Sequence, residues 1–274
     1  MINYEKNKKN IFFLLLAFIN ILGYIAFATN NYDSRAKIIF FDVGQGDSTL
    51  ILAENDNQVL IDGGDGKKIM DKLGQYMPFY DHTIELLVIT HPDSDHIGGL
   101  VEVIQNYDVK EVMQTKYSCD SDICKELDAI MSKKKILKRY AAAGQTIYAG
   151  NQTLQVLFPE DENISENDDN DNSIVLRADI NGKAILLMAD AGFKTENSLM
   201  ERNVNLRADM LRISHHGSKN ATSLKFIEKV SSKKAIVSVG KNKYGHPSQD
   251  VLNRLKNINI SVLRTDEVGD ISVE

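Results

Sequence analysis

The sequence predicts an α/β fold in which two mixed β-sheets form a sandwich and helices cover its outer faces. Short runs rich in β-branched and aromatic residues alternate with stretches of helical periodicity. The pattern occurs twice, because each half of the chain begins with several strands and continues with strand–helix units. About 240 residues follow an unusual N-terminal segment, and that length suits one large α/β domain.

The N-terminal segment combines three lysines with a long apolar run. Lys6, Lys8 and Lys9 precede residues 11–28, which are almost entirely apolar. This order is typical of a signal peptide or a membrane anchor. The lysine-rich flank is expected to stay cytoplasmic, which would place the rest of the chain outside the cytoplasm, membrane-bound or secreted.

Ala26-Phe27-Ala28 resembles the small-x-small pattern of a signal-peptide cleavage site. An anchor and a cleaved signal therefore both remain open. We divide the chain into an N-terminal segment, residues 1–32, and a folded domain, residues 33–274.

The folded domain begins with strands and tight turns. A Gly-rich turn is expected at 62–66, and an acidic, solvated loop at 161–172. Strands are expected at residues 37–41, 48–52, 58–61, 86–90, 135–138, 145–148, 153–158, 173–180, 183–188, 210–213, 235–239 and 271–273. Helices are expected at residues 67–76, 97–107, 195–202, 223–230 and 249–257.

The two cysteines, Cys119 and Cys124, lie in a polar stretch before a helix. Neither has a histidine or a third cysteine close in sequence, which argues against a zinc knuckle. Outside the cytoplasm, a pair this close can form a disulfide, and the sequence leaves that pairing open.

The segment His91-Pro92-Asp93-Ser94-Asp95-His96 follows an apolar run. Two imidazoles and two carboxylates in six residues suit Zn²⁺, Mn²⁺ or Fe, and they suit two ions better than one. The i, i+2 spacing places His91 and Asp93 on the same side of an extended segment. Asp95 and His96 adjoin the expected helix start, from which they can face a second ion.

Three other strand ends carry the same kinds of side chain. Asp190 follows the strand 183–188, the pair His215-His216 follows 210–213, and His246 lies a short loop after 235–239. Functional groups of α/β proteins gather in loops at the carboxyl ends of strands. Of the six histidines, only His82 falls outside this scheme.

These motifs resemble the metallo-β-lactamase fold, and within it the hydrolase-like domain of the ComEC DNA-uptake competence proteins and their stand-alone relatives. The resemblance extends from about residue 38 to near the C-terminus. It rests on Phe41-Asp42-Val43-Gly44-Gln45-Gly46-Asp47-Ser48, Ile61-Asp62-Gly63-Gly64, residues 90–99, Asn172-Ser173, Asp190, residues 214–218 and Gly245-His246-Pro247-Ser248.

The resemblance implies an αββα sandwich with a site for two divalent metal ions, Zn²⁺ or Mn²⁺, between the sheets. It implies that His91 and Asp93 bind one ion, and that Asp95, His96 and His215 bind the other. It further implies that Asp190 bridges the ions and that Asp62 supports the histidine loop, residues 91–96. His216 and His246 are implied to contact substrate or carry a proton. Asp42, Gln45 and Asp47 are expected to shape the first turn without binding metal.

Asp93 marks a departure from the lactamases, which often carry histidine at this place and a further histidine ligand between the two halves. This chain has no histidine between 97 and 214. A carboxylate in place of an imidazole hardens the site and shifts its preference toward Mn²⁺ or Mg²⁺. The nuclease-like branch shares this aspartate, so phosphodiester chemistry is favoured over lactam hydrolysis.

The sequence therefore predicts an extracytoplasmic, metal-dependent phosphodiesterase or nuclease that acts on DNA through a metal-bridging hydroxide, with Asp95, His216 and His246 in catalytic roles. The net charge of −6 implies no general basic face, so a long polyanion would need a local patch or metal ions. That charge mildly favours an alternative, an esterase for phosphorylcholine or another small phosphodiester. A second alternative is a non-catalytic, membrane-tethered module that binds DNA or a partner. Nothing in the sequence indicates the oligomeric state.

Overall fold

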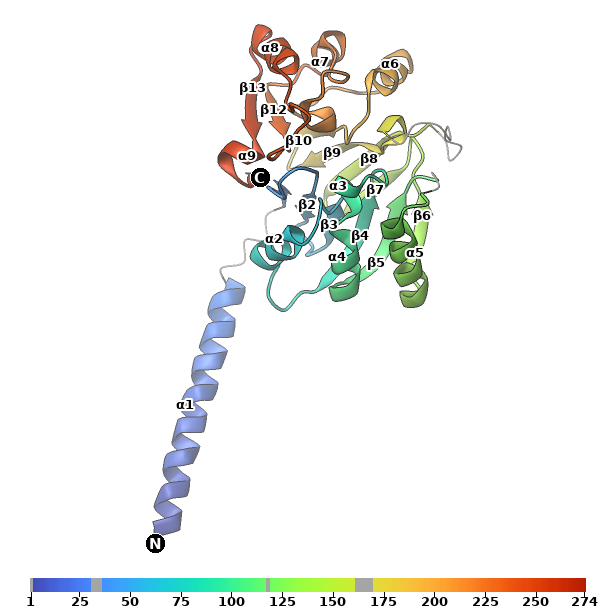
Figure 1. Cartoon of the computed structure of the whole chain (residues 1–274). Coiled ribbons are helices and arrows are strands. Elements are labelled where there is room, and N and C mark those ends of the chain that lie inside the picture. The colour runs from blue at the N-terminus through green and yellow to red at the C-terminus, as the bar shows by residue number, and fades with distance from the viewer. Residues whose placement is uncertain (1, 31–35, 117–118, 161–169) are drawn as a thin grey trace. The chain divides into compact units, whose positions relative to one another are not determined.

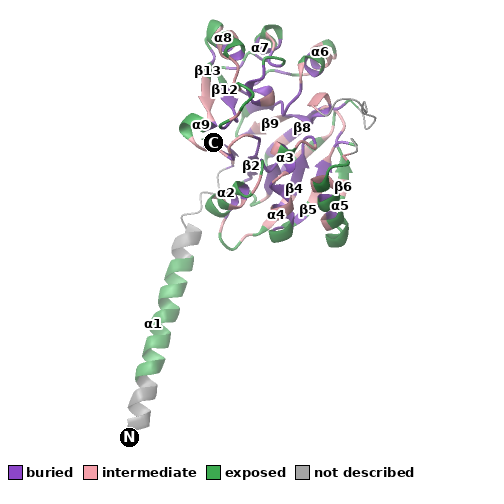
Figure 2. Ribbon diagram, viewed as in Figure 1, coloured by how far each residue is buried: buried purple, intermediate pink, exposed green. Residues whose placement is uncertain are grey.

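A computed structural model describes residues 2–30, 36–116, 119–160 and 170–274. The chain divides into two units, Met1–Ser34 and Arg35–Glu274. The first unit contains helix α1 (Ile2–Asn30), whose residues 9–25 are exposed (Figure 2). In the described part of the chain, no helix is long and apolar enough to cross a membrane. The side chains of the expected cleavage site at 26–28, and residues 161–169 of the expected acidic loop, lie outside the described residues.

The first sheet of the second unit has seven strands, of which β3, β4, β5 and β6 run parallel and β14, β1, β2 and β3 pair antiparallel. In spatial order the strands are β14 (Ile271–Val273), β1 (Lys37–Phe40), β2 (Thr49–Leu52), β3 (Gln58–Ile61), β4 (Thr83–Ile89), β5 (Asp108–Gln114) and β6 (Leu137–Tyr140).

The second sheet repeats this plan, because β10, β11, β12 and β13 run parallel and β7, β8, β9 and β10 pair antiparallel. Its spatial order is β13 (Ser261–Arg264), β12 (Lys234–Val237), β11 (Met210–Arg212), β10 (Lys183–Leu187), β9 (Val175–Ile180), β8 (Gln152–Phe158) and β7 (Thr146–Ala149).

Helices cover the outer face of each sheet (Figure 1). The first sheet carries α2 (Lys68–Tyr76), α3 (Ser94–Ile97), α4 (Leu100–Asn106) and α5 (Asp122–Lys134), and the second carries α6 (Phe193–Glu201), α7 (Leu224–Val230) and α8 (Gln249–Asn257). Short helices η1 (Asn170–Asn172), η2 (Ser214–Gly217) and α9 (Thr265–Val268) lie in connections.

Three buried apolar clusters hold these layers together. One lies between the sheets and includes Phe40, Val88 and Leu187, while the other two join each sheet to its helices around Leu87 and Leu211. A strand buried on both faces reads as a continuous apolar run, which explains residues 86–89. The αββα arrangement confirms the predicted fold class of two mixed sheets with outer helices.

Some elements differ from expectation. Strands β5 and β13 were not expected from the sequence, and β6 begins at Leu137 because α5 continues to Lys134 and ends at the left-handed Lys135. The helix expected at 97–107 is divided into α3 and α4 at Gly98 and Gly99. A Cβ on Gly99 would lie 2.4 Å from the Gly63 carbonyl oxygen. Because glycine has no Cβ, the start of α4 can pack against this neighbouring loop.

The structure joins Cys119 and Cys124 by a disulfide, with Cα atoms 5.9 Å apart. The bond lies at the N-terminus of α5, where the Ser121 side chain caps the helix by accepting from Cys124 N–H. The possibility that the sequence left open is therefore realised in the structure.

Candidate metal centre

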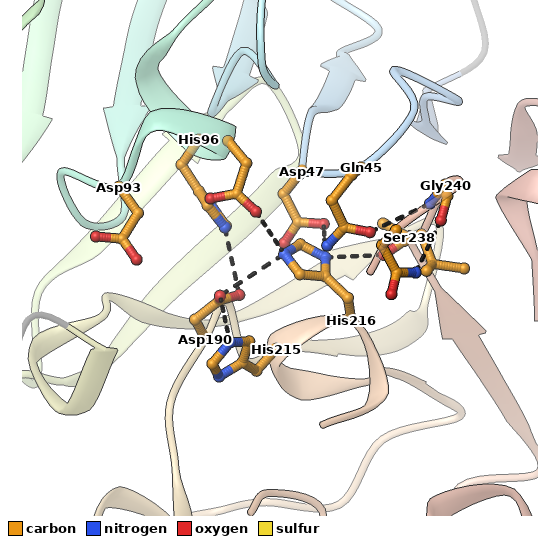
Figure 3. A network of polar contacts seen from close by, with 12 residues as sticks. Gln45, Asp47, Asp93, His96, Asp190, His215, His216, Ser238 and Gly240 are labelled. Carbon is orange, nitrogen blue, oxygen red and sulfur yellow. Dashed lines mark hydrogen bonds and ion pairs between the residues drawn. The ribbon is translucent and has the colours of Figure 1, made fainter. Parts of the chain in front are cut away.

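The strand ends that carry histidine and aspartate come together at one edge of the sandwich. They belong to the loops after β1, β3 and β4 of the first sheet and after β10, β11 and β12 of the second. Parallel strands bring their carboxyl ends to a common edge, and here the two sheets present those edges to each other. Figure 3 shows the side chains that meet there.

Backbone hydrogen bonds join the loops of the first sheet. Asp47 N–H donates to the Asp95 carbonyl at 3.1 Å, and Gly63 N–H donates to the His96 carbonyl at 2.7 Å. Gly46 adopts φ +122°, and a Cβ there would lie 2.2 Å from the Asp95 carbonyl oxygen. Only glycine allows this approach, so the Gly-Gln-Gly turn fixes the position of the histidine loop.

Three buried histidines share one arrangement around the centre. Nδ1 of His216 donates to the Ser238 carbonyl at 2.9 Å, and Nδ1 of His96 lies 2.8 Å from Asp62 Oδ2. Nδ1 of His91 lies 3.1 Å from the Thr90 hydroxyl. That hydroxyl donates its single proton to Asp62, so it accepts from His91. The three Nε2 atoms are buried, and the ion pairs that they form are all with carboxylates of the centre.

Asp62 anchors this arrangement from behind. It is 1% exposed and accepts from Thr90 N–H at 2.9 Å and from the Thr90 hydroxyl at 2.6 Å, besides its contact with His96. Carboxylates that hold Nδ1 of a metal-binding histidine orient the ring and fix the tautomer. Asp62 therefore has the supporting position that the resemblance implied.

Asp190 lies at the middle of the centre. His96 Nε2 is 3.3 Å from its Oδ1, while Nε2 atoms of His91, His215 and His216 lie 3.9, 3.7 and 3.7 Å from its Oδ2. Burial raises the pKa of Asp190, but the positive charges of His216 and His96 outweigh it and lower that pKa well below its ordinary value. Asp190 is therefore a carboxylate at neutral pH, and its buried Oδ1 faces His96 Nε2.

The neighbouring charges also shift the pKa values of His96 and Asp95. Burial lowers the pKa of His96, but the charges of Asp190 and Asp62 outweigh burial and raise it well above the ordinary value. Burial raises the pKa of Asp95, yet His216, whose Nε2 lies 3.2 Å from Asp95 Oδ2, and the charge of His96 bring it down to about 2. The raised pKa of His96 favours a proton on this imidazole, which offsets part of the negative charge.

Left-handed backbone places two of the histidines. His215 and His216 have φ of 48° and 52°, and Ala189, next to Asp190, has φ of 45°. Consecutive left-handed residues other than glycine are unfavourable and persist where surrounding contacts enforce them. This turn directs His216 into the centre, where it is 1% exposed, and leaves the side chain of His215 32% exposed at the margin.

A buried ion pair supports His216. Arg212 and Asp47 form a close ion pair, and Arg212 also donates to the Ala189 carbonyl at 2.7 Å. Nδ1 of His216 lies 3.8 Å from Asp47 Oδ1. Sequence reasoning treated Asp47 as a turn residue and did not single out Arg212, because only the packing of the two sheets brings them together.

Donor atoms of four predicted ligands and of His216 form close groups among the described residues. They are His91 with His96 and Asp190, and Asp95 with His96 and His216. Further groups with Asp47 combine it with Asp190 and His216, or with Asp62 and His96.

Two predicted ligands stand at the edge of the centre. Asp93 has a side chain 40% exposed, with Oδ2 3.7 Å from His91 Nε2, and it stands apart from the rest in Figure 3. His215 contacts Asp190 alone among the carboxylates of the centre. The roles predicted for Asp93, His215, His216 and His246 remain predictions, while the geometry adds His216 to the atoms that face the centre.

The centre opens into a cavity of about 720 Å³. Asp95, Asp190 and His216 form its floor, and His246 and Lys241 belong to the loop after β12 that borders it. Burial, together with the charge of His215, lowers the pKa of His246, so this imidazole is neutral at neutral pH.

The donor set fits divalent cations. Three Nε2 atoms and Asp190 Oδ1 are buried and converge, and each imidazole can give up its Nε2 proton while keeping its Nδ1 contact. Burying charged groups together is costly, and nitrogen and carboxylate donors in this density are satisfied by metal ions. The metallo-β-lactamase fold likewise implies divalent metal binding.

Comparison with known proteins shows the family of this chain. The model of the metallo-beta-lactamase superfamily matches residues 41–241. The chain is 30% identical over 256 residues to ComE operon protein 3 of Bacillus subtilis, covering 87% of this chain and 33% of that protein. It is 30% identical over 243 residues to competence protein ComA of Neisseria gonorrhoeae, covering 86% and 32%.

Among solved structures, the metallo-beta-lactamase fold protein YhfI from Bacillus subtilis superposes with a TM-score of 0.59 at 13% identity, covering 87% of this chain and 100% of YhfI. That likeness shows the fold. The chain spans about a third of the length of the two competence relatives. The predicted resemblance is confirmed, and the chain belongs to the metallo-β-lactamase superfamily, as a relative of the hydrolase-like domain of the competence proteins.

Proposed function

We propose that this protein is a metal-dependent phosphodiesterase that hydrolyses DNA. The fold and the His/Asp cluster support a metal-dependent hydrolase, and relatives named as competence proteins support DNA as the substrate. One observation carries the proposal: buried imidazole nitrogens from the loops after β4 and β11 converge on Asp190, which follows β10 and lines an open cavity.

Two groups of side chains would hold the ions. His91, His96 and Asp190 form one, and Asp95, His96 and His216 form the other, with Zn²⁺ and Mn²⁺ as the candidates. When bound, divalent ions lower the pKa of water and neutralise charge on phosphoryl oxygens.

The protein's own groups act around that chemistry. Asp62, Thr90 and the Ser238 carbonyl fix the imidazoles through Nδ1, so the centre needs little reorganisation. Neutral His246 at the cavity margin is suited to accept a proton from the attacking water, whose oxygen bonds to phosphorus as the ester P–O bond breaks.

The test is cleavage of end-labelled single-stranded and duplex DNA by the full chain with Mn²⁺ or Zn²⁺, with EDTA as the metal-free condition. We expect cleavage that EDTA abolishes and that falls at least 100-fold in Asp95→Asn, since metal-ligand contacts are worth several kcal/mol. Asp81→Asn is the matched control, because Asp81 accepts hydrogen bonds before β4, at the end of the strand away from the site. Absence of metal-dependent cleavage, or full activity of Asp95→Asn, would refute the proposal.

A small phosphodiester, such as phosphorylcholine esterified to a second alcohol, remains the second candidate, favoured by the net charge of −6. Hydrolysis of bis-nitrophenyl phosphate without cleavage of DNA would select it.

We also propose that the N-terminal segment, residues 1–32, anchors the chain in the membrane or directs its export, so that the catalytic domain acts outside the cytoplasm. The lysines before the apolar run support this proposal. Expression in a bacterial host, followed by mass measurement and alkaline extraction of membranes, tests it. A full-length chain in the soluble cytoplasmic fraction would contradict it.

A further inference from the structure

We propose that the loop after β12 is a platform that stacks one unpaired base of a nucleic-acid strand on Tyr244 while Lys241 and Lys243 contact its phosphates. The inference rests on the proposed function, because it assigns the substrate class of the same site. It adds a preference for single strands and the residues that create it.

The loop presents an exposed aromatic ring beside the centre. Tyr244 is 65% exposed and borders the cavity that holds Asp95 and Asp190. Its ring lies 5.8 Å from the ring of His246, which lies 5.5 Å from that of His215. A series of rings therefore leads from the Asp190 carboxylate, 3.7 Å from His215, to an accessible aromatic surface.

The platform is rigid because Asn242 holds the loop from within. Its Oδ1 accepts from the N–H groups of Tyr244 and His246 at 3.0 and 3.1 Å, and its Nδ2 donates to the carbonyls of Gly240 and His246 at 2.9 and 2.8 Å. A loop whose backbone is held in place before binding loses less entropy when a base stacks on its tyrosine.

The loop carries positive charge, whereas the net charge of the chain is negative. Lys241 and Lys243 are exposed at the cavity, and within the described residues neither forms an ion pair. Lys243 Nζ lies 5.7 Å from the centre of the Tyr244 ring. One ammonium group beside the ring and a second on the lining of the same cavity attract phosphate and repel a quaternary ammonium, which favours a nucleic-acid strand over a choline ester.

A base can reach Tyr244 only when it is free of its pairing partner. Stacking on aromatic side chains is the usual way in which proteins bind single strands, and it tolerates any sequence because every base has a π-face. The platform therefore selects single-stranded over duplex substrate. The histidine and aspartate side chains of the centre alone would recognise only phosphate.

The test measures binding without cleavage. The full chain in EDTA is titrated into a fluorescent thymidine oligonucleotide, into an abasic strand of the same length, and into the duplex. We expect the wild type to bind the thymidine strand best, and Tyr244→Leu to lose roughly 5- to 100-fold of that affinity while its affinity for the abasic strand stays constant. Tyr244→Phe should retain wild-type affinity. Tyr80→Leu is the matched control, since Tyr80 is also exposed, at 56%, but lies before β4.

Lys241→Gln and Lys243→Gln should each weaken binding of both strands and lower the slope of log K against log salt by about 0.7. Equal binding of the thymidine strand by wild type and Tyr244→Leu would overturn the platform, as would equal binding of thymidine and abasic strands by the wild type. Because binding is read in EDTA, a chain that binds in this pattern but never cleaves DNA supports the platform and refutes the proposed activity.

Discussion

Asp62→Asn is the change that best tests whether Asp62 orients His96 for metal binding or is only a buried side chain. Oδ1 of Asp62 accepts from Thr90 N–H, and Oδ2 accepts from the Thr90 hydroxyl and faces Nδ1 of His96. Asparagine has nearly the same shape but replaces one oxygen by a donor. If the NH₂ group faces Thr90 N–H, two donors meet. If it faces His96, Nδ1 must accept and Nε2 must carry the proton, so the lone pair that faces Asp190 is lost.

The magnitude follows from these contacts. A hydrogen bond to a charged group is worth about 1.5–3 kcal/mol, which corresponds to roughly 10- to 100-fold in an equilibrium constant. Partners that orient metal-binding histidines affect metal affinity by about the same factor. We therefore expect Asp62→Asn to bind Zn²⁺ or Mn²⁺ roughly 10- to 100-fold more weakly than the wild type.

The assay is competition with a chromogenic chelator at fixed pH, together with circular dichroism to verify that each variant is folded. Asp81→Asn controls for loss of an aspartate that accepts hydrogen bonds from Thr83 and Gln58, since it makes the same chemical change at the far end of β4. A folded Asp62→Asn protein with wild-type metal affinity would refute the role of Asp62 in holding His96.

Three further changes test other parts of the structure. Arg212→Met leaves Asp47 buried without its partner and should lower the free energy of unfolding in urea by about 3–5 kcal/mol; an unchanged midpoint would contradict the buried ion pair. Gly46→Ala should lower the free energy of unfolding by at least about 1–3 kcal/mol, since the added Cβ meets the Asp95 carbonyl at positive φ. A variant as stable as the wild type would show that the loops can separate freely. The raised pKa of His96 stabilises the metal-free chain below about pH 6.5, and this contribution is lost as pH rises through the folded-state pKa. Metal binding near pH 7 should therefore release protons, measured by calorimetry in buffers of different ionisation enthalpy, and zero net release would contradict the assignment.

Local sequence was enough to place most of the strands and the histidine loop. Residues 86–96 combine a buried strand with donors at its end, and that combination is visible without tertiary information. Strand β5 escaped notice because Lys110 and Glu111 interrupt its apolar pattern, and β13 because it is short and only half-buried. Their assignment depends on pairing with neighbours that are distant in sequence.

The composition of the site was harder to predict than its location. Adjacent His215 and His216 are equivalent in sequence, and only the left-handed turn decides that His216 faces the centre. The Asp47–Arg212 pair joins residues from different sheets, so no local pattern reveals it. Asp62, by contrast, was recognisable from its position at the end of β3, and its hydrogen bonds agree with that expectation.

The central claim, that the buried histidines and Asp190 form a divalent metal centre, is tested most directly by the metal content of the purified chain. The measurement compares wild type with His96→Ala, and with His82→Ala as control, since His82 is exposed before β4. After loading with Zn²⁺ or Mn²⁺ and gel filtration, we expect bound metal in the wild type and His82→Ala, and a loss of at least one ion per chain in His96→Ala. No bound metal in the wild type, or equal metal in all three proteins, would contradict the account.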